Sequence, residues 1–129
     1  MDEKKTWMEQ LIHLDLFSGI GGFALATRWV GGFETIAFCE IDKYARGVLK
    51  KNFKGIPIFE DVTKLHPTEL IPRDGIIHLI SAGFPCQDLS VAGKGRGIEA
   101  DRSGLFFEIT RLSDEIYAYC GVRPCLCLE

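Results

Sequence analysis

Leu11-Ile-His-Leu-Asp-Leu-Phe17, followed by Ser18-Gly-Ile-Gly-Gly22, is the stretch of sequence that decides the fold. The first part is an apolar run of strand length, and the second is a glycine-rich turn. Apolar residues at helical spacing follow over residues 23–30. A strand that passes through a tight turn into a helix is typical of the first unit of a parallel α/β sheet, and the crevice at such a turn is where cofactors bind.

The same alternation continues along the chain. We expect a second strand over residues 33–40, a helix from Lys43 to about Phe53 capped by Asp42, and a short strand over residues 56–59. One helical turn near Pro67 and a buried strand over residues 75–82 follow. Residues 83–102 are expected to lack regular structure, and Ser103 is expected to cap a last helix. This pattern predicts an α/β fold with a mostly parallel sheet of four strands, and at best a weak fifth strand in residues 113–129.

The composition limits the classes of function. The chain has 129 residues, of which 47% are hydrophobic, enough for one soluble domain with a real core. It contains no apolar stretch near the ~18 residues that a membrane span needs and no apolar secretion signal, so we expect a cytoplasmic protein. Fifteen Lys and Arg against eighteen Asp and Glu give a net charge of −3. A domain that grips nucleic acid over its whole surface is normally basic, so any DNA contact is expected to be local or supplied by other sequence.

The five cysteines are Cys39, Cys86, Cys120, Cys125 and Cys127. An odd number without a secretion signal indicates free thiols in a reducing compartment. The cluster near the C-terminus has no Cys-x-x-Cys pair and no histidine nearby, so no metal site is expected there.

Acidic residues end the second and third predicted strands. Glu40 stands twenty-one residues after Gly19, the place from which a carboxylate binds ribose hydroxyls. Asp61 can accept a hydrogen bond from an exocyclic amine such as adenine N6. The glycine spacing differs from that of dinucleotide sites, which favours a ligand with an amino-acid head group over a phosphate. The alternative is a tight turn without a ligand, flanked by two solvated acids.

Cys86 lies in the turn Gly83-Phe-Pro-Cys-Gln87, directly after the most apolar strand. We expect it at the carboxyl edge of the sheet, beside the same crevice, where a thiolate can act as a nucleophile. Its sequence neighbours include no histidine that could serve as a base, so a protease-type pair is poorly supported. The alternative is a buried structural cysteine. The loop that follows mixes glycines with Lys94 and Arg96, which suits contacts to a phosphate backbone but is also typical of a flexible surface loop.

These blocks, in this order, resemble those of the cytosine-5 DNA methyltransferases. The similar segments are DLFSGIGGF at 15–23, EID at 40–42, DV at 61–62, GFPCQDLS at 83–90, GKGRG at 93–97 and RSGLFF at 102–107. The resemblance covers about residues 11–112. It implies a Rossmann-like, S-adenosylmethionine-dependent methyltransferase fold, S-adenosylhomocysteine as a product, and a cytosine flipped out of duplex DNA as methyl acceptor.

The resemblance also implies roles for individual residues. Cys86 would add to cytosine C6 so that C5 can take the methyl group, and loss of the C5 proton and of Cys86 would restore the ring. The implied cofactor contacts are Phe17, Gly19, Gly21, Glu40, Ile41, Asp61, Val62, Pro85 and Leu105. The implied DNA contacts are Gln87, Ser90, Lys94 and Arg96.

The same resemblance implies a later Glu-Asn-Val strand, whose glutamate protonates cytosine N3, then a target-recognition region and a closing helix. We identify none of these after Leu112. We therefore expect residues 1–112 to form the cofactor and nucleophile part, truncated, and residues 113–129 a divergent tail, with no turnover by this chain alone. The alternatives are an inactive S-adenosylmethionine-binding remnant and a subunit completed by a separate chain. Self-association through an exposed sheet edge is expected in either case.

A nicotinamide or thiol-redox protein is a further alternative from another class. The glycine spacing disfavours a nicotinamide site, and the absence of a Cys-x-x-Cys pair disfavours redox chemistry.

Overall fold

The computed structural model describes residues 10–71, 75–83 and 95–129, with backbone alone over 95–103. Five parallel strands form one sheet in the order β3-β2-β1-β4-β5. The strands are β1 (Leu11–Leu16), β2 (Phe33–Cys39), β3 (Ile58–Phe59), β4 (Leu79–Ala82) and β5 (Cys125–Leu128). The helices are α2 (Gly22–Val30), α3 (Lys43–Asn52) and α4 (Gly95–Cys120), with short 3₁₀ helices η1 (Val62–Lys64) and η2 (Pro67–Glu69). No helix in the described ranges is long and apolar enough to cross a membrane.

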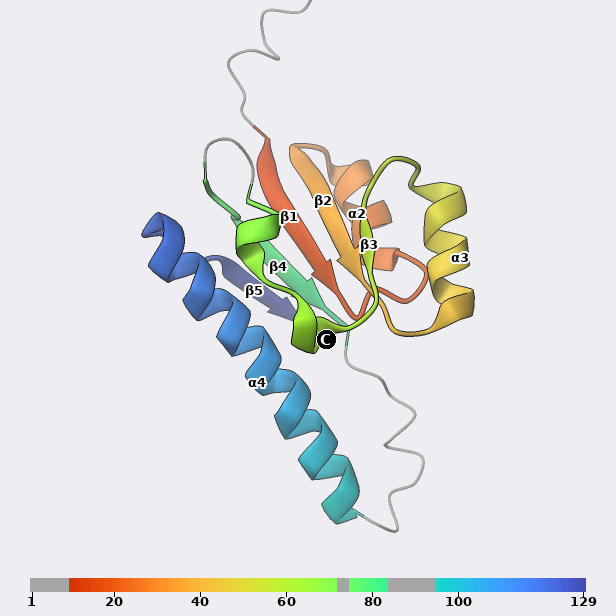
Figure 1. The fold of residues 1–129 in the computed structure, drawn as a ribbon. Helices are drawn as coiled ribbons and strands as arrows, with labels where there is room; N and C mark the ends of the chain where they lie inside the picture. Colours follow the sequence, from red (N-terminus) through yellow and green to blue (C-terminus); the bar gives the residue numbers. More distant parts are fainter. Residues whose placement is uncertain (1–9, 72–74, 84–94) are drawn as a thin grey trace, which may run out of the picture.

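The helices cover both faces of the sheet (Figure 1). On one face α4 supplies Ile109, Leu112 and Ile116 to a core that includes Leu14 and Leu16 of β1. On the other face α2 and α3 enclose a smaller core of Ala24, Phe38, Leu49 and Phe53. This three-layer arrangement confirms the predicted α/β class with a parallel sheet, and it buries β1 on both faces.

Local signals mark the start of α3, as predicted, and the end of α2. The side chain of Asp42 caps α3 by accepting a hydrogen bond of 2.8 Å from the backbone N–H of Ala45. Gly31 follows α2 with a positive φ, and its N–H reaches the carbonyl of Thr27. The helical turn near Pro67 is also present, as η2.

The predictions for the second half of the chain are partly wrong. Regular structure resumes at Gly95, so Ser103 lies inside α4 and does not cap it. The helix signal is weak there because Gly95 and Gly97 each disfavour a helix by ~1 kcal/mol. The sheet also has a fifth strand, which the sequence indicates only weakly because the strand is short and follows Pro124.

Candidate functional site at the carboxyl edge of the sheet

Four neighbouring strands deliver the predicted site residues to one edge of the sheet. Because all strand pairs are parallel, the segments that follow β1, β2, β3 and β4 leave the sheet on the same side. These segments carry the glycine turn, Glu40, Asp61 and Gly83 respectively. In open α/β sheets this carboxyl edge is where ligands bind.

Glu40 is bonded to the glycine turn. Its Oε1 accepts a hydrogen bond of 2.7 Å from the backbone N–H of Gly19, and its Oε2 accepts one of 2.8 Å from the N–H of Asp42. The backbone N–H of Ser18 also reaches the carbonyl of Cys39, at 3.2 Å. Each carboxylate oxygen keeps a further lone pair, so Glu40 can still accept hydrogen bonds from the two hydroxyls of a ribose.

The two glycines of the turn differ in their surroundings. Gly19 has φ of 56°, and a Cβ placed on it would meet nothing within 4 Å. Gly21 has φ of 99°, and a Cβ there would lie 2.5 Å from Phe53 Cε2 and 3.0 Å from Leu49 Cδ2. Gly19 therefore leaves open space beside Glu40, whereas Gly21 is required by the packing of the turn against α3.

Phe17 and Gly83 bring the first and fourth strand ends together. The backbone N–H of Gly83 donates a hydrogen bond of 3.4 Å to the carbonyl of Leu16, and a Cβ on Gly83 would lie 3.6 Å from the carbonyl oxygen of Phe17. Phe17 itself has φ of 51°, a conformation that non-glycine residues adopt rarely. The chain that leads to Cys86 thus leaves the sheet beside the glycine turn.

The predicted nucleophile, most predicted DNA contacts and one predicted cofactor contact, Pro85, lie outside the described residues. These are Pro85, Cys86, Gln87, Ser90 and Lys94. Arg96 lies in the first turn of α4, in the part where only the backbone is described.

The remaining predicted cofactor contacts occupy three different environments. Ile41 is 69% exposed beside Glu40, while Val62 is buried in the core under α4. Asp61 accepts hydrogen bonds from the N–H and the hydroxyl of Thr63 at 2.9 and 2.7 Å, which holds the pKa of this carboxyl below its usual range. Leu105 is half-buried on α4. Ile41 and Asp61 are thus open to a ligand, whereas the side chain of Val62 packs inward.

Arg111 of α4, which was not predicted as a functional residue, holds the segment after β3 in place. Its Nη2 donates to the carbonyls of Val62 and Leu65 at 2.9 and 3.1 Å. Ion pairs of 2.8 Å to Glu108 and Glu115 orient the guanidinium. The only sequence signal is the spacing of these acids, three residues before and four residues after the arginine.

A chain of hydrogen-bonded polar side chains, three of them buried and one half-buried, crosses three strands beneath the glycine turn. Ser81 donates a hydrogen bond of 2.7 Å to Asp15 Oδ1, His13 Nε2 lies 2.6 Å from the Ser81 hydroxyl, and His13 Nδ1 lies 2.8 Å from the hydroxyl of Thr35. The Ser81 hydroxyl uses its hydrogen in the bond to Asp15, so it accepts a hydrogen bond from Nε2 of His13. Nδ1 of His13 then accepts one from the hydroxyl of Thr35. Within the described part of the chain, Oδ2 of Asp15 has no hydrogen-bond partner.

Burial shifts the pKa values of this polar chain in opposite directions. It raises the pKa of Asp15 to about 7, with a smaller contribution from Glu40, and lowers the pKa of His13 to about 4. It also raises the pKa of the Cys39 thiol to about 12, which makes that cysteine a poor nucleophile.

Glu129 follows β5 and is the second residue at this edge that was not predicted. Its backbone N–H donates a hydrogen bond of 3.0 Å to the carbonyl of Ala82, directly before Gly83. Glu129 therefore stands at the carboxyl edge next to the strand that leads to Cys86. The sequence signal that could have identified Glu129 is a glutamate directly after a short apolar run.

Comparison with known proteins agrees with this arrangement. The profile of the C-5 cytosine-specific DNA methylases matches residues 11–117. The chain belongs to this family. Among curated members, the type II methyltransferase M2.BsuMI of Bacillus subtilis is 44% identical over 102 residues, which are 79% of this chain and 24% of that protein. M.HhaI of Haemophilus parahaemolyticus is 40% identical over 112 residues, 87% of this chain and 32% of that protein.

Solved structures support the same assignment of fold. A DNMT2 variant from Spodoptera frugiperda superposes with a TM-score of 0.52 at 26% identity, over 60% of this chain and 23% of that one. This C-5 cytosine methylase chain therefore has the fold of S-adenosylmethionine-dependent methyltransferases, as the resemblance implied. It spans about a quarter to a third of the length of these curated relatives.

Proposed function

We propose that this chain forms the cofactor-binding and nucleophile part of a DNA (cytosine-5-)-methyltransferase. The observation that supports this most directly is the hydrogen bond between Gly19 and Glu40, at the sheet edge from which Gly83 leads to Cys86. A carboxylate held against an open glycine turn suits a nucleoside with two free ribose hydroxyls.

S-adenosylmethionine fits the residues at this edge. Glu40 would accept hydrogen bonds from the ribose hydroxyls, Asp61 would accept one from the adenine amine, and Phe17 and Ile41 would pack on the adenine ring. Gly19 leaves room for the ligand because a side chain there would project into open space. The remaining proposed contacts are Pro85, Leu105 and the backbone of Gly21 and of Val62, since the side chain of Val62 packs inward. When bound, the cofactor supplies a methyl group on a sulfonium.

Cys86 is the proposed nucleophile toward a cytosine flipped out of duplex DNA. Its thiolate forms a bond to C6, and the electron pair of the C5–C6 double bond then takes the methyl group at C5. Loss of the C5 proton re-forms the double bond and expels the thiolate. Gln87, Ser90, Lys94 and Arg96 are the proposed contacts to the DNA.

Glu129 is the proposed acid for cytosine N3, the role that the resemblance gives to the glutamate of a Glu-Asn-Val strand. Addition of the thiolate at C6 places negative charge on the ring, and a neighbouring acid at N3 neutralises it. The support is the position of Glu129 after β5, hydrogen-bonded to Ala82 beside the start of the Cys86 segment. General acid help of this kind is typically worth ~10²–10⁴-fold in rate.

The cofactor assignment is tested by calorimetry with S-adenosylmethionine, where we expect one site per chain. Absence of binding would overturn the proposal. The nucleophile is tested with S-adenosylmethionine and duplex DNA that contains 5-fluorocytosine. After methyl transfer to C5 this base has no C5 proton to lose, so the thiolate is not expelled and the adduct is trapped. A covalent protein–DNA adduct that is lost in Cys86→Ser and retained in Cys125→Ser, at an exposed cysteine of β5, would support this role. Cofactor binding without any adduct would favour the alternative, a module that binds S-adenosylmethionine without turnover or is completed by another chain.

The role of Glu129 is tested by the rate of adduct formation. We expect Glu129→Gln to slow it ~10²–10⁴-fold, because the amide cannot give a proton to N3. Glu69→Gln, at an exposed glutamate of η2, is the matched control and should leave the rate unchanged. Equal rates for the two variants would remove Glu129 from the reaction.

A further inference from the structure

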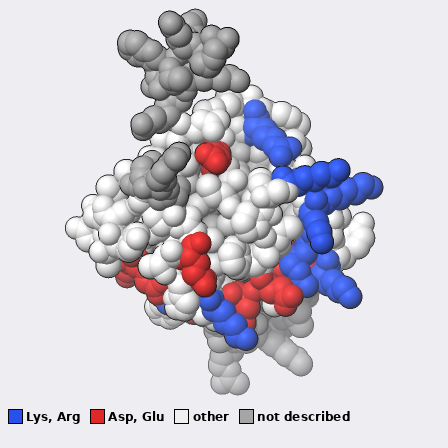
Figure 2. Space-filling model, turned by 45° about the horizontal axis from the view of Figure 1, so that its top comes forward, with Lys and Arg blue, Asp and Glu red and all other residues white. Residues whose placement is uncertain are grey.

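One segment of the chain is strongly basic although the whole chain carries a net charge of −3. Residues 43–54, which comprise α3 and the two residues after it, contain no Asp or Glu. Their cations are Lys43, Arg46, Lys50, Lys51 and Lys54. Figure 2 shows Lys and Arg side chains gathered along one side of the molecule, the side on which α3 lies in Figure 1.

Arg46 differs from the lysines because its side chain stabilises the fold. Its guanidinium donates to the carbonyls of Glu40 and Ile41 at 3.1 and 2.6 Å and forms an ion pair with Glu60. Lys43, Lys50, Lys51 and Lys54, which we call the α3 lysines, are all exposed, and none forms an ion pair with a described residue.

Helix stability explains the lysines at only one end of α3. Lys50 and Lys51 lie in the last turn of α3, where cations interact favourably with the helix dipole. Lys43 lies in the first turn, where a cation is unfavourable, although the carboxylate of the cap residue Asp42 stands beside it. The helix dipole therefore does not account for a lysine at this position.

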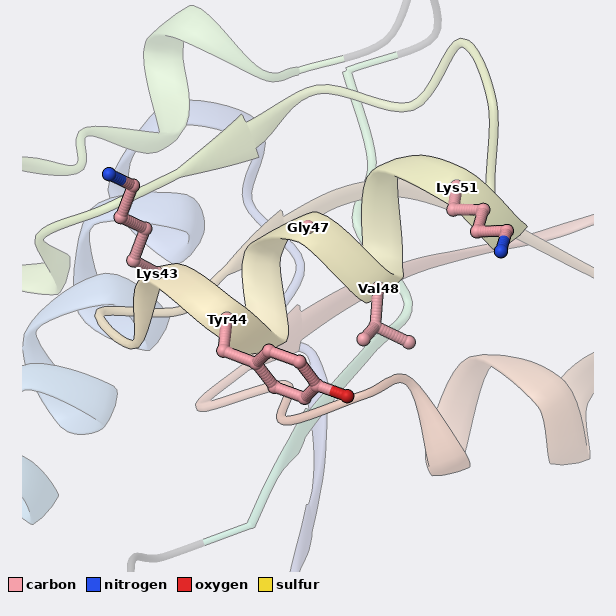
Figure 3. Close-up of a pocket in the computed structure, with 5 residues that line it drawn as sticks. All are labelled: Lys43, Tyr44, Gly47, Val48 and Lys51. Atoms are coloured by element: carbon pink, nitrogen blue, oxygen red, sulfur yellow. The ribbon is translucent and has the colours of Figure 1, made fainter.

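Between its charged ends the face is hollowed and carries an aromatic ring. Lys43, Tyr44, Gly47, Val48 and Lys51 line a shallow hollow on α3. In Figure 3 the ammonium groups of Lys43 and Lys51 stand at opposite ends, with Tyr44 and Val48 between them. Tyr44 is 79% exposed. A helix rises about 12 Å over the eight positions from Lys43 to Lys51, a length of duplex axis along which one DNA strand carries three to four phosphates.

We propose that this face of α3 is a second, sequence-independent contact for the phosphate backbone of duplex DNA. The face begins directly after Glu40, Ile41 and Asp42 at the carboxyl edge and runs away from it along α3, so a duplex engaged at that edge can continue along the lysines. The flat face of Tyr44 offers a packing surface for a sugar. An acidic protein would match the charge too, but the centres of protein interfaces are depleted in lysine and depend on apolar anchors. Two lysines on either side of one aromatic ring, with two more exposed lysines toward the end of the segment, favour the phosphate backbone.

The test measures the binding of a fluorescent duplex of A·T pairs only by anisotropy, between 50 and 200 mM KCl. Such a duplex contains no cytosine, so the result does not depend on methyl transfer. We expect the slope of log K against log salt to become shallower by about 0.9 for each phosphate that a variant no longer neutralises. Lys43→Gln/Lys51→Gln should therefore reduce it by about 1.8, and neutralising all four α3 lysines should reduce it by about 3 to 4. Lys64→Gln, at an exposed lysine of η1, is the matched control and should leave the slope unchanged by comparison.

Two further measurements keep the proposal falsifiable. Tyr44→Ala should weaken binding several-fold without changing the salt slope, because it removes packing and no charge. Thermal melting should show that all variants remain folded, since the substituted side chains are exposed. Unchanged affinity and slope in the four-lysine variant would overturn the proposal. A different result would favour an acidic protein partner and overturn the proposal: the wild type binds poly-glutamate, and the four-lysine variant loses that binding but still binds the duplex.

Discussion

The backbone N–H of Gly19 lies 2.7 Å from Oε1 of Glu40, so one carboxylate joins the turns that follow the central strand β1 and its neighbour β2. The same carboxylate holds the N–H of Asp42 at the start of α3. Glu40 therefore orders the edge of the sheet before any ligand arrives, and a ligand can bind without a large rearrangement of these turns.

Glu40→Ala is expected to weaken S-adenosylmethionine binding several-fold or more, because it removes both the ribose acceptor and the link to Gly19. Isothermal titration calorimetry measures the change directly. Glu60→Ala removes a nearby, mostly exposed carboxylate that pairs with Arg46 and should leave the affinity unchanged. Equal affinities for the Glu40 variant and the wild type would contradict the assignment.

Substitution of the two turn glycines should separate binding from folding. Gly21→Ala forces a Cβ to within 2.5 Å of the Phe53 ring at a positive φ, and it should lower the free energy of unfolding by about 1–3 kcal/mol. Gly19→Ala meets no neighbour, so it should cost about 1–2 kcal/mol through backbone strain alone and act mainly on cofactor affinity. Urea unfolding and calorimetry on both variants provide the comparison. If Gly21→Ala lost more cofactor affinity than Gly19→Ala and kept its stability, Gly21 and not Gly19 would be the glycine that matters for binding.

The buried pair His13 and Asp15 should give opposing pH dependences of stability. With its pKa raised to about 7, Asp15 contributes stability that is full below about pH 4 and is lost as the pH rises to 7, because the folded state alone keeps the proton. With its pKa lowered to about 4, His13 contributes stability that is lost as the pH falls from 6.5 to 4. The two effects partly cancel in the wild type.

Replacing either residue should therefore reveal the pH dependence of stability that the other one causes. Between pH 4 and 6.5 we expect the free energy of unfolding to rise with pH in Asp15→Asn and to fall with pH in His13→Gln. Urea unfolding at several pH values measures both slopes. Parallel curves for the wild type and the two variants would show that neither group titrates as its burial implies.

Arg111→Met should loosen the segment after β3. The substitution leaves the carbonyls of Val62 and Leu65 without their donor and should cost about 1–3 kcal/mol of stability. Arg123→Met removes a more exposed arginine, paired with Asp114, and serves as the control with a change below about 1 kcal/mol. Hydrogen exchange of the Thr63 and Lys64 amides reports on the same segment. Unchanged exchange in Arg111→Met would be the contrary result.

Association through β5 is the last expectation. This strand ends the described sheet, and it exposes Leu126 and Leu128 by 37% and 40%. An unpaired apolar edge favours pairing with a second chain. We expect sedimentation velocity to show mass increasing with concentration, and Leu126→Lys to reduce this increase. A single monomeric species at all concentrations would count against it.

Sequence reasoning recovers the first half of the fold because its signals are local. The strand, glycine turn and helix at residues 11–30 are contiguous, and Asp42 caps its own helix. The neighbouring positions of Glu40 and Gly19 are also predictable, since parallel strands bring their carboxyl ends together.

Other features depend on pairings that the linear sequence does not reveal. The contacts among His13, Ser81 and Asp15 require the register of β1 against β4, which are more than sixty residues apart. Glu129 gains significance only because β5 pairs with β4. Helix propensity is also misleading at Gly95, because a local glycine penalty is overcome in a helix that continues to Cys120 and packs on the sheet.

The strand order β3-β2-β1-β4-β5 has a consequence for synthesis on the ribosome. The first three strands in the chain form one contiguous half of the sheet, and β4 and β5 add afterwards to the free side of β1. Nascent chains emerge from the N-terminus, so residues 11–59 can pair before β4 is translated. During that interval the flank of β1 that later receives β4 is uncovered, and a pause in translation there would lengthen its exposure to other nascent chains.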